Sequence, residues 1–153
     1  MDKFTIVIPV YNEAKNLKVL IPKIYQELKN RKFEIIVVDD NSTDMTSKIL
    51  KKFNKNNFHH FIRKNERDLS KSCILGFKKS KYKNIIVMDG DLQHKPSDIK
   101  KFLYVYHKIN PDIIVGTRDL FKNKKHNLNI FRLYVSRILI LIVNLLLGNK
   151  TSD

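Results

Sequence analysis

The stretch of this 153-residue chain best suited to chemistry is an apolar run that ends in two carboxylates, Asp89 and Asp91, separated by Gly90. In an extended backbone, residues two apart point to the same side, so both carboxylates can reach one point. Two like charges that close repel, and a divalent cation would relieve the repulsion. Oxygen ligands suit Mg²⁺ or Mn²⁺, and Gln93 offers a third oxygen. A simple polar turn after a strand is the alternative interpretation.

The elements that must position these residues can be predicted from hydrophobic periodicity. Strands are predicted at residues 4–9, 33–38, 58–62, 85–88 and 112–116. The run at 85–88 is expected to be a buried, central strand. Helical patterns alternate with the strands, which predicts an α/β fold with right-handed β-α-β units and a mainly parallel sheet covered by helices on both faces. The chain length favours a single domain over residues 1–153.

The predicted helices carry specific expectations about which residues they bury. Apolar residues recur at helical spacing in the first helix, at Leu17, Leu20, Ile21, Ile24 and Leu28. Asn12 is predicted to be the N-cap of that helix. The helix over residues 69–79 is predicted to bury Cys73, Ile74 and Phe77.

Polar clusters follow three of the predicted strands, at residues 9–13, 39–44 and 89–93, and Arg118 follows the fifth. Ligands of parallel α/β sheets bind beyond the carboxyl ends of the strands, so one crevice can collect all of these residues. That coincidence strengthens the prediction of a metal site.

The sequence lacks both G-x-G-x-x-G and the P-loop motif, and its four glycines cannot build a glycine-rich phosphate cradle. A dehydrogenase or P-loop enzyme is therefore not expected, and side chains with a metal ion would have to hold any phosphates. Asp39 and Asp40 suit ribose hydroxyls or base N–H groups. They can equally form a strand exit and a helix N-cap, and both interpretations can hold together.

The composition adds a strong positive charge, with 30 Lys and Arg against 15 acidic residues and a net charge of +15. Such an excess favours an anionic partner, which can be nucleic acid, a membrane surface or a phosphorylated ligand. A single cysteine excludes an internal disulfide and favours a reducing compartment. The apolar residues 130–147 are interrupted by polar side chains, which predicts a core or interfacial helix and not a membrane span.

Three segments in this order resemble the motifs of family 2 glycosyltransferases: FTIVIPVYNE at 4–13, VDDNSTD at 38–44 and MDGDLQHKP at 88–96. Within that family the chain most resembles the polyprenol-phosphate (dolichol-phosphate) mannosyltransferases. Gly116-Thr117-Arg118 and Arg132 match the same branch. The resemblance covers essentially the whole chain and implies the GT-A fold, a Rossmann-like domain that binds nucleotide sugars.

The resemblance also implies roles for individual residues. The nucleoside pocket would be lined by Pro9, Tyr11, Glu13, Asp39 and Asp40, with a further donor contact at Asp68. Asp89, Asp91 and Gln93 would hold Mg²⁺ or Mn²⁺ on the donor diphosphate. Asp91, Arg118 and Arg132 would form the catalytic set, with the two arginines on the phosphate of the acceptor. Arg118 and Arg132 can alternatively be solvated surface residues.

The reaction that the resemblance implies is transfer of a sugar, with inversion, from GDP-mannose or another nucleotide sugar to polyprenyl phosphate. A phosphate monoester has a second pKa near ~6 and is already a nucleophile at neutral pH, so no catalytic base is assigned. The expected location is cytoplasmic and peripheral, at the inner face of the membrane. The acidic clusters would repel a phosphate backbone, so nucleic acid is not expected as a partner.

Two departures from the family pattern leave alternatives open. Leu69-Ser70-Lys71-Ser72-Cys73 stands where the family has a glycine- and alanine-rich helix start, which weakens the expectation at Asp68. The chain also stops where the family domain continues, as a fragment, a truncated gene or half of a split enzyme would. The alternatives are a family 2 enzyme with a saccharide hydroxyl acceptor, a basic nucleic-acid-binding domain, and an inactive donor-binding fragment.

Overall fold

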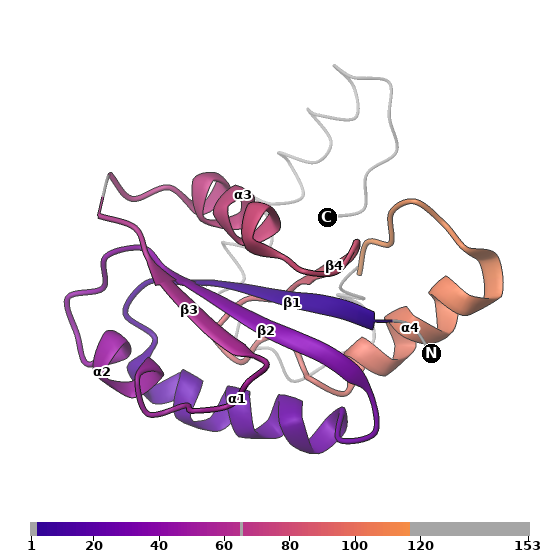
Figure 1. The fold of residues 1–153 in the computed structure, drawn as a ribbon, viewed down its shortest axis with the longest axis horizontal. Helices are drawn as coiled ribbons and strands as arrows, with labels where there is room; N and C mark the ends of the chain where they lie inside the picture. The colour runs from indigo at the N-terminus through magenta and orange to yellow at the C-terminus, as the bar shows by residue number, and fades with distance from the viewer. Residues whose placement is uncertain (1–2, 65, 117–153) are drawn as a thin grey trace, which may run out of the picture. The chain divides into compact units, whose positions relative to one another are not determined.

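A computed structural model describes residues 3–64 and 66–116 (Figure 1). The chain divides into two compact units, residues 1–109 and residues 110–153. The elements of the first unit are β1 (Lys3–Val10), α1 (Ala14–Glu27), β2 (Lys32–Asp39), α2 (Thr46–Leu50), β3 (Phe58–Ile62), α3 (Leu69–Lys79), β4 (Asn84–Val87) and α4 (Asp98–Ile109). The strands form one parallel sheet in the order β3-β2-β1-β4. The predicted α/β class is confirmed, whereas the single domain over 1–153 stays a prediction.

The register of the sheet brings the ends of its strands together. β1 and β2 pair along their whole length, and the last pair joins Val10 to Asp39. Beyond that pair, the Asp40 amide still donates to the Val10 carbonyl at 2.9 Å. On the other side of β1, the Met88 amide donates to the Val7 carbonyl at 3.0 Å. The loops that follow β1, β2 and β4 therefore start next to one another.

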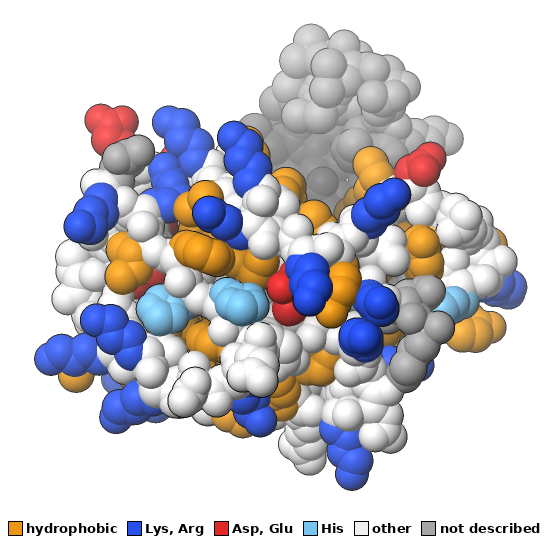
Figure 2. All heavy atoms as spheres, in the orientation of Figure 1, with side chains coloured by type: hydrophobic (Ala, Val, Ile, Leu, Met, Phe, Trp, Pro, Cys, Tyr) orange, Lys and Arg blue, Asp and Glu red, His pale blue; other side chains and the backbone are white. Residues whose placement is uncertain are grey.

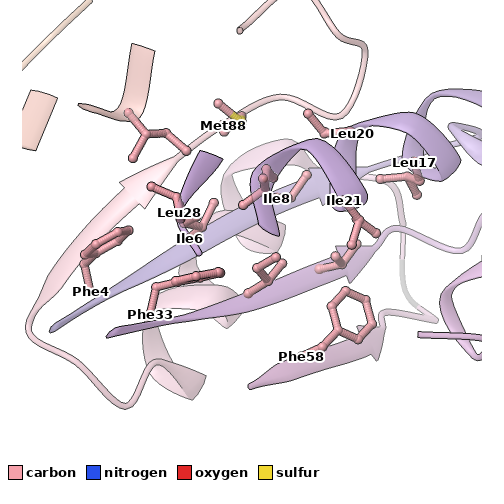
Figure 3. Packing of buried hydrophobic residues seen from close by; sticks show 14 of the residues in the cluster. Phe4, Ile6, Ile8, Leu17, Leu20, Ile21, Leu28, Phe33, Phe58 and Met88 are labelled. Carbon is pink, nitrogen blue, oxygen red and sulfur yellow. The ribbon is translucent and has the colours of Figure 1, made fainter. Parts of the chain in front are cut away.

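The main hydrophobic core lies between the sheet and α1 (Figure 3). Alternate residues of β1, among them Ile6 and Ile8, face α1 because successive side chains of a strand point to opposite faces. The predicted apolar positions of the helix are all 0% exposed: Leu17, Leu20, Ile21, Ile24 and Leu28. Full burial of each such side chain contributes roughly 1.5–3 kcal/mol, so this helix firmly anchors the loop before it.

Helix α3 covers the opposite face of the sheet, and Figure 1 shows it across the sheet from α1 and α2. Its buried positions are Ser72 and Gly76, whereas Ile74 and Phe77 are 47% and 41% exposed. A Cβ on Gly76 would lie 2.3 Å from Cγ1 of Val7, so the helix backbone sits directly on β1. The prediction that α3 buries Ile74 and Phe77 is therefore wrong, because the helix lies so close to β1 that its buried face has room only for small side chains.

The strand predictions fail at β4 and at residues 112–116. β4 was expected to be buried and central, but within the described residues it is an edge strand with Val87 exposed. Residues 112–116 form no strand, and Ile113 and Val115 are 79% and 76% exposed. Their β-branched composition favours a strand, but a strand also requires a hydrogen-bonding neighbour, which composition cannot supply.

Candidate functional site

A hollow of about 230 Å³ opens where β1, β2 and β4 end. Four separate segments of the chain supply its walls, namely the loops after β1, β2 and β4 and the start of α3. The lining residues are Pro9, Val10, Tyr11, Glu13, Asp40, Arg67, Leu69, Ser72, Asp89, Gly90 and Asp91. The structure thus brings six of the predicted site residues together: Pro9, Tyr11, Glu13, Asp40, Asp89 and Asp91. It also adds a basic side chain, that of Arg67, to a wall rich in carboxylates.

Asp40 forms a buried ion pair with Arg63 beneath this hollow. The other oxygen of Asp40 accepts a hydrogen bond from the Asp68 amide at 2.7 Å. Arg63 also donates to the Asp68 carbonyl at 3.0 Å and to the Ser72 hydroxyl at 3.2 Å. These bonds tie the end of β2 to the start of α3. Sequence analysis gave Arg63 no role, because its partner lies 23 residues away.

Asp39 is fully buried and does not line the hollow. Its carboxylate accepts from the Ser42 amide at 2.9 Å and from the Ser47 hydroxyl at 2.6 Å. Both oxygens are therefore engaged in holding the loop after β2. This arrangement matches the structural alternative, a strand exit, while the assignment of Asp39 to the nucleoside pocket stays a prediction.

The loops after β1 and β2 are joined by Asn12, which was predicted to cap α1. Asn12 instead adopts a left-handed backbone, with φ of 59°, a conformation that asparagine tolerates. Its amide donates to the Ser42 hydroxyl at 2.8 Å, and its side-chain oxygen accepts from the Thr43 amide at 2.8 Å. The N-cap prediction is wrong because the side chain is used between the loops.

Asp44, in the loop after β2, caps the start of α1. One oxygen of Asp44 accepts from the Ala14 amide at 3.2 Å, and the other accepts from the Thr46 amide at 2.9 Å. One carboxylate thereby accepts hydrogen bonds from backbone amides at the start of both α1 and α2, where an anion is favoured. Desolvation would raise the pKa of Asp44, but the hydrogen bonds from Thr46 and Ala14 outweigh it and lower the pKa.

Arg67 covers the ring of Tyr11 at the mouth of the hollow, with its guanidinium carbon 4.3 Å from the ring centroid. Such a cation–π contact contributes roughly 0.5–1 kcal/mol at an exposed site. The arrangement puts an aromatic face and a positive charge next to each other. Sequence analysis passed over Arg67 as part of a charged loop, and the only available signal was its place just before α3.

The loop after β4 carries the paired carboxylates, Asp89 and Asp91. The Gln93 amide donates to Asp91 Oδ1 at 2.9 Å, and the Asp89 amide donates to His94 Nδ1 at 3.3 Å. Leu92 has φ of 66°, which is unfavourable for a leucine, while its side chain packs against the core. Packing of Leu92 thus holds a strained turn that places Asp89 and Asp91 in the lining.

Gly90 is needed because this loop lies directly against β1. A Cβ at this position would lie 2.8 Å from Cγ1 of Val10.

Cys73 of helix α3 is the one cysteine of the chain. Burial, together with the negative charge of Asp89, raises the pKa of its thiol. A raised pKa disfavours the thiolate, which is the reactive form of a cysteine.

A divalent cation can be tested against the donor set of the described residues. Nowhere in residues 3–64 and 66–116 do three or more His, Cys, Asp and Glu side chains gather as a metal site. The chain thus offers the two carboxylates of Asp89 and Asp91, while Gln93 is exposed and outside the lining. Two carboxylates fit Mg²⁺ or Mn²⁺ when the phosphates of a bound substrate complete the coordination.

Of the remaining predicted residues, Asp68 lies outside the lining. Asp68 is the N-cap of α3, where its side chain accepts from the Lys71 amide at 2.9 Å. Arg118 and Arg132 lie outside the described residues, as does the segment 130–147. No helix in the described part of the chain is long and apolar enough to cross a membrane. The roles assigned to Asp68, Arg118 and Arg132 stay predictions.

Comparison with known proteins finds one matching family profile and several similar proteins. The profile of Glycosyl transferase family 2 matches residues 5–150. A dolichol-phosphate mannosyltransferase of Pyrococcus furiosus is 35% identical over 141 residues, which are 92% of this chain and 40% of the relative. The chain therefore spans less than half the length of that curated relative.

Two solved structures share the fold. The mannosyltransferase PcManGT from Pyrobaculum calidifontis, in complex with GDP-Man and Mn²⁺, has a TM-score of 0.55 and 22% identity, and the match covers 62% of this chain and 29% of that one. S. aureus TarS 1-349, in complex with UDP-GlcNAc, has a TM-score of 0.61 and 22% identity over 79% of this chain and 38% of its own. The expected GT-A fold is confirmed.

Proposed function

This chain belongs to glycosyl transferase family 2, and on that premise we propose that it transfers a sugar from a nucleotide sugar to polyprenyl phosphate. The observation that carries the proposal is that one hollow is lined by Tyr11 and Asp40 on one side and by Asp89 and Asp91 on the other. A nucleoside diphosphate sugar has the same division, with a neutral, hydroxyl-rich end and an anionic end.

The nucleoside of the donor would bind at the β1–β2 side of the hollow. Tyr11 presents an aromatic ring, and base–aromatic stacking contributes roughly 1–3 kcal/mol per base. Asp40 and Glu13 carry acceptor oxygens for ribose hydroxyls or base N–H groups. The donor favoured by similarity is GDP-mannose, because a mannosyltransferase of the same fold has a structure with GDP-Man.

The diphosphate of the donor would lie at the β4 side, next to Asp89 and Asp91. Unassisted, these carboxylates would repel it, so the proposal includes Mg²⁺ or Mn²⁺ held by Asp89 and Asp91, with Gln93 as a further candidate ligand. When bound, the cation would neutralise charge on the leaving diphosphate. A structural neighbour contains Mn²⁺, which supports this choice.

The acceptor is inferred from the curated relative, which is named a dolichol-phosphate mannosyltransferase. A phosphate monoester is largely ionised at neutral pH, so attack with inversion at the anomeric carbon needs positioning and charge stabilisation and no general base. Arg118 and Arg132 are the proposed phosphate ligands, with Asp91 as the third member of the catalytic set. The proposed location is the cytoplasmic face of a membrane, with the protein bound peripherally.

Titration of GDP-mannose in the presence and absence of Mn²⁺ tests this proposal. We expect Mn²⁺-dependent binding by the unmodified chain and loss of that dependence in Asp91→Ala, with at least about a tenfold weaker Kd. A matched control is Asp98→Ala, because Asp98 begins α4 away from the hollow. Undiminished metal-dependent binding by Asp91→Ala would contradict the proposal.

The choice of acceptor and donor is tested by direct competition. Polyprenyl phosphate and saccharide acceptors should be offered with GDP-mannose and with UDP-GlcNAc, since TarS has a structure with the second donor. Transfer to saccharide alone would place the chain among family 2 enzymes that use hydroxyl acceptors. Donor binding without transfer to any acceptor would identify a donor-binding fragment.

A further inference from the structure

A second hollow, of about 510 Å³, lies between the end of β3 and the outer side of α3. We name it the α3 groove, and it is lined by Ile62, Arg63, Lys64, Lys71, Ile74, Leu75 and Lys78. The proposed glycosyl transfer makes no use of this surface. Its walls come from one side of the sheet and from one helix, and all of its residues belong to the unit 1–109.

The α3 groove combines exposed apolar side chains with positive charge. Its lining contains three aliphatic and four basic side chains, and of the basic ones Arg63 is buried against Asp40 while Lys71 Nζ lies 3.5 Å from the Asp68 carboxylate. Ile62 and Ile74 are exposed, and so is the neighbouring Phe77. Next to them, Lys79 Nζ lies 5.4 Å from the ring centroid of Phe61. Figure 2 shows hydrophobic side chains lying between lysines over α3 and β3.

This combination favours one class of anionic partner. A polynucleotide would be held by basic side chains together with polar or aromatic contacts to its bases, and exposed isoleucines would add little. Anionic phospholipids present negative headgroups directly above an apolar layer. Lysine side chains can reach the headgroups while the aliphatic residues enter the layer beneath.

We propose that the α3 groove is a docking surface for anionic phospholipid membranes. Helix α3 also links this surface to the transferase site, because Leu69 and Ser72 line the site hollow whereas Lys71 and Ile74 line the groove. Docking through α3 would bring the site close to a membrane-embedded acceptor. In that respect the inference rests on the proposed function.

Co-sedimentation of the full chain with vesicles tests the docking surface. Vesicles of phosphatidylcholine with one quarter phosphatidylglycerol should bind the chain, and phosphatidylcholine vesicles should not. The double variant Lys64→Glu/Lys78→Glu should bind the anionic vesicles at least about tenfold more weakly, because each lysine near an anionic surface contributes substantially. Ile74→Ser should also weaken binding, since it removes an inserted apolar group.

The matched control is Lys18→Glu/Lys23→Glu, which makes the same change in net charge on exposed positions of α1. This control should stay within about twofold of the unmodified chain, because α1 lies on the opposite face of the sheet from the groove. Equal loss in the two double variants would overturn the proposal, and so would full vesicle binding by Lys64→Glu/Lys78→Glu. If Lys64→Glu/Lys78→Glu weakens binding of a single-stranded RNA oligomer but not binding of vesicles, the partner is a polynucleotide and the proposal is also overturned.

GDP-mannose titration of the same proteins separates this inference from the proposed function. The groove variant should bind the donor with Mn²⁺ as the unmodified chain does, since Lys64 and Lys78 lie outside the site hollow. Vesicle binding without any donor binding would contradict only the transferase assignment. Donor binding without any preference for anionic vesicles would contradict only the docking surface.

Discussion

The two sides of the site hollow are built in different ways. On the β2 side, the Asp40 side chain is 5% exposed and is held by Arg63 and the Asp68 amide. On the β4 side, the Asp89 side chain is 47% exposed, and Nδ1 of His94 lies 3.8 Å from its carboxylate. One wall is thus fixed by internal bonds before any ligand arrives, and the other keeps carboxylates directed at solvent.

The position of each strand in the sheet explains this difference. β2 is paired on both sides, with β1 and with β3, whereas β4 is paired only with β1 in the described sheet. A carboxylate after an interior strand must find partners within the protein, because burying an unpaired charge is costly. One after an edge strand remains hydrated. We infer a preformed nucleoside wall and a diphosphate wall that is completed by its ligand.

The largest effect on stability that tests this comparison is expected from Asp40→Ala. Removing Asp40 leaves Arg63 buried without its anion, so the free energy of unfolding should fall by about 3–5 kcal/mol. The equivalent change on the other wall, Asp91→Ala, should alter stability by less than about 0.5 kcal/mol. Urea denaturation followed by circular dichroism measures both.

An exposed ion pair provides the control for Asp40→Ala. Glu27→Ala breaks the contact between Glu27 and Lys100, which are 2.6 Å apart on the surface, and should cost at most about 1 kcal/mol. Similar losses for Asp40→Ala and Asp91→Ala would contradict the division into a rigid and an open wall.

The sequence was sufficient wherever local pattern decides structure. The bounds of β3 and α3 were predicted as the structure has them, and the five apolar positions of α1 are all buried. The three polar clusters were placed at strand ends because parallel topology requires it. The gathering of Pro9, Tyr11, Asp40 and Asp91 around one hollow follows from that topology.

Failures occurred where a distant partner decides the role of a residue. Asn12 binds the loop after β2 in place of capping its own helix, and Asp44 caps α1 from 30 residues away. Arg63 has its partner 23 residues away at the end of β2, and Gly76 is buried because a neighbouring strand approaches closely. None of these contacts leaves a local periodicity, so pattern analysis could not find them.

A smaller effect is expected from Asp68→Ala, which tests whether the rigid wall extends to the start of α3. The hydrogen bond from the Lys71 amide, together with the positive charge of Lys71, lowers the pKa of Asp68 below its ordinary value of 3.8. A group with a lowered pKa in the folded state stabilises fully above its unfolded pKa, and that contribution is lost as pH falls through the folded value. Asp68→Ala should therefore reduce stability at pH 6 and have less effect at pH 3.

Urea midpoints at both pH values check this prediction, with Asp68→Asn as the comparison. Asparagine can still cap the helix but does not titrate, so it should remove the pH dependence and keep most of the stability at pH 6. A donor role for Asp68 would appear differently, as weaker GDP-mannose binding by Asp68→Asn with an unchanged urea midpoint.

A small change in stability is also expected from Arg67→Ala, which probes the mouth of the hollow between the two walls. Arg67 is exposed and lies over the Tyr11 ring, so its loss should alter the free energy of unfolding by less than about 1 kcal/mol. Among the described residues that line the hollow, Arg67 is the only basic one, beside Glu13, Asp40, Asp89 and Asp91. Its removal should weaken GDP binding by roughly threefold to tenfold, because the anionic diphosphate would then meet carboxylates alone. Arg67→Lys keeps the charge without the planar group, so its affinity for GDP should fall between those of the unmodified chain and Arg67→Ala.

Calorimetric titration of GDP at two salt concentrations separates the contribution of charge from that of the planar group. The loss of affinity in Arg67→Ala should shrink at high salt if it arises from charge. Tighter GDP binding by Arg67→Ala would mean instead that Arg67 competes with the base for the Tyr11 ring, and the nucleoside wall would then not be preformed.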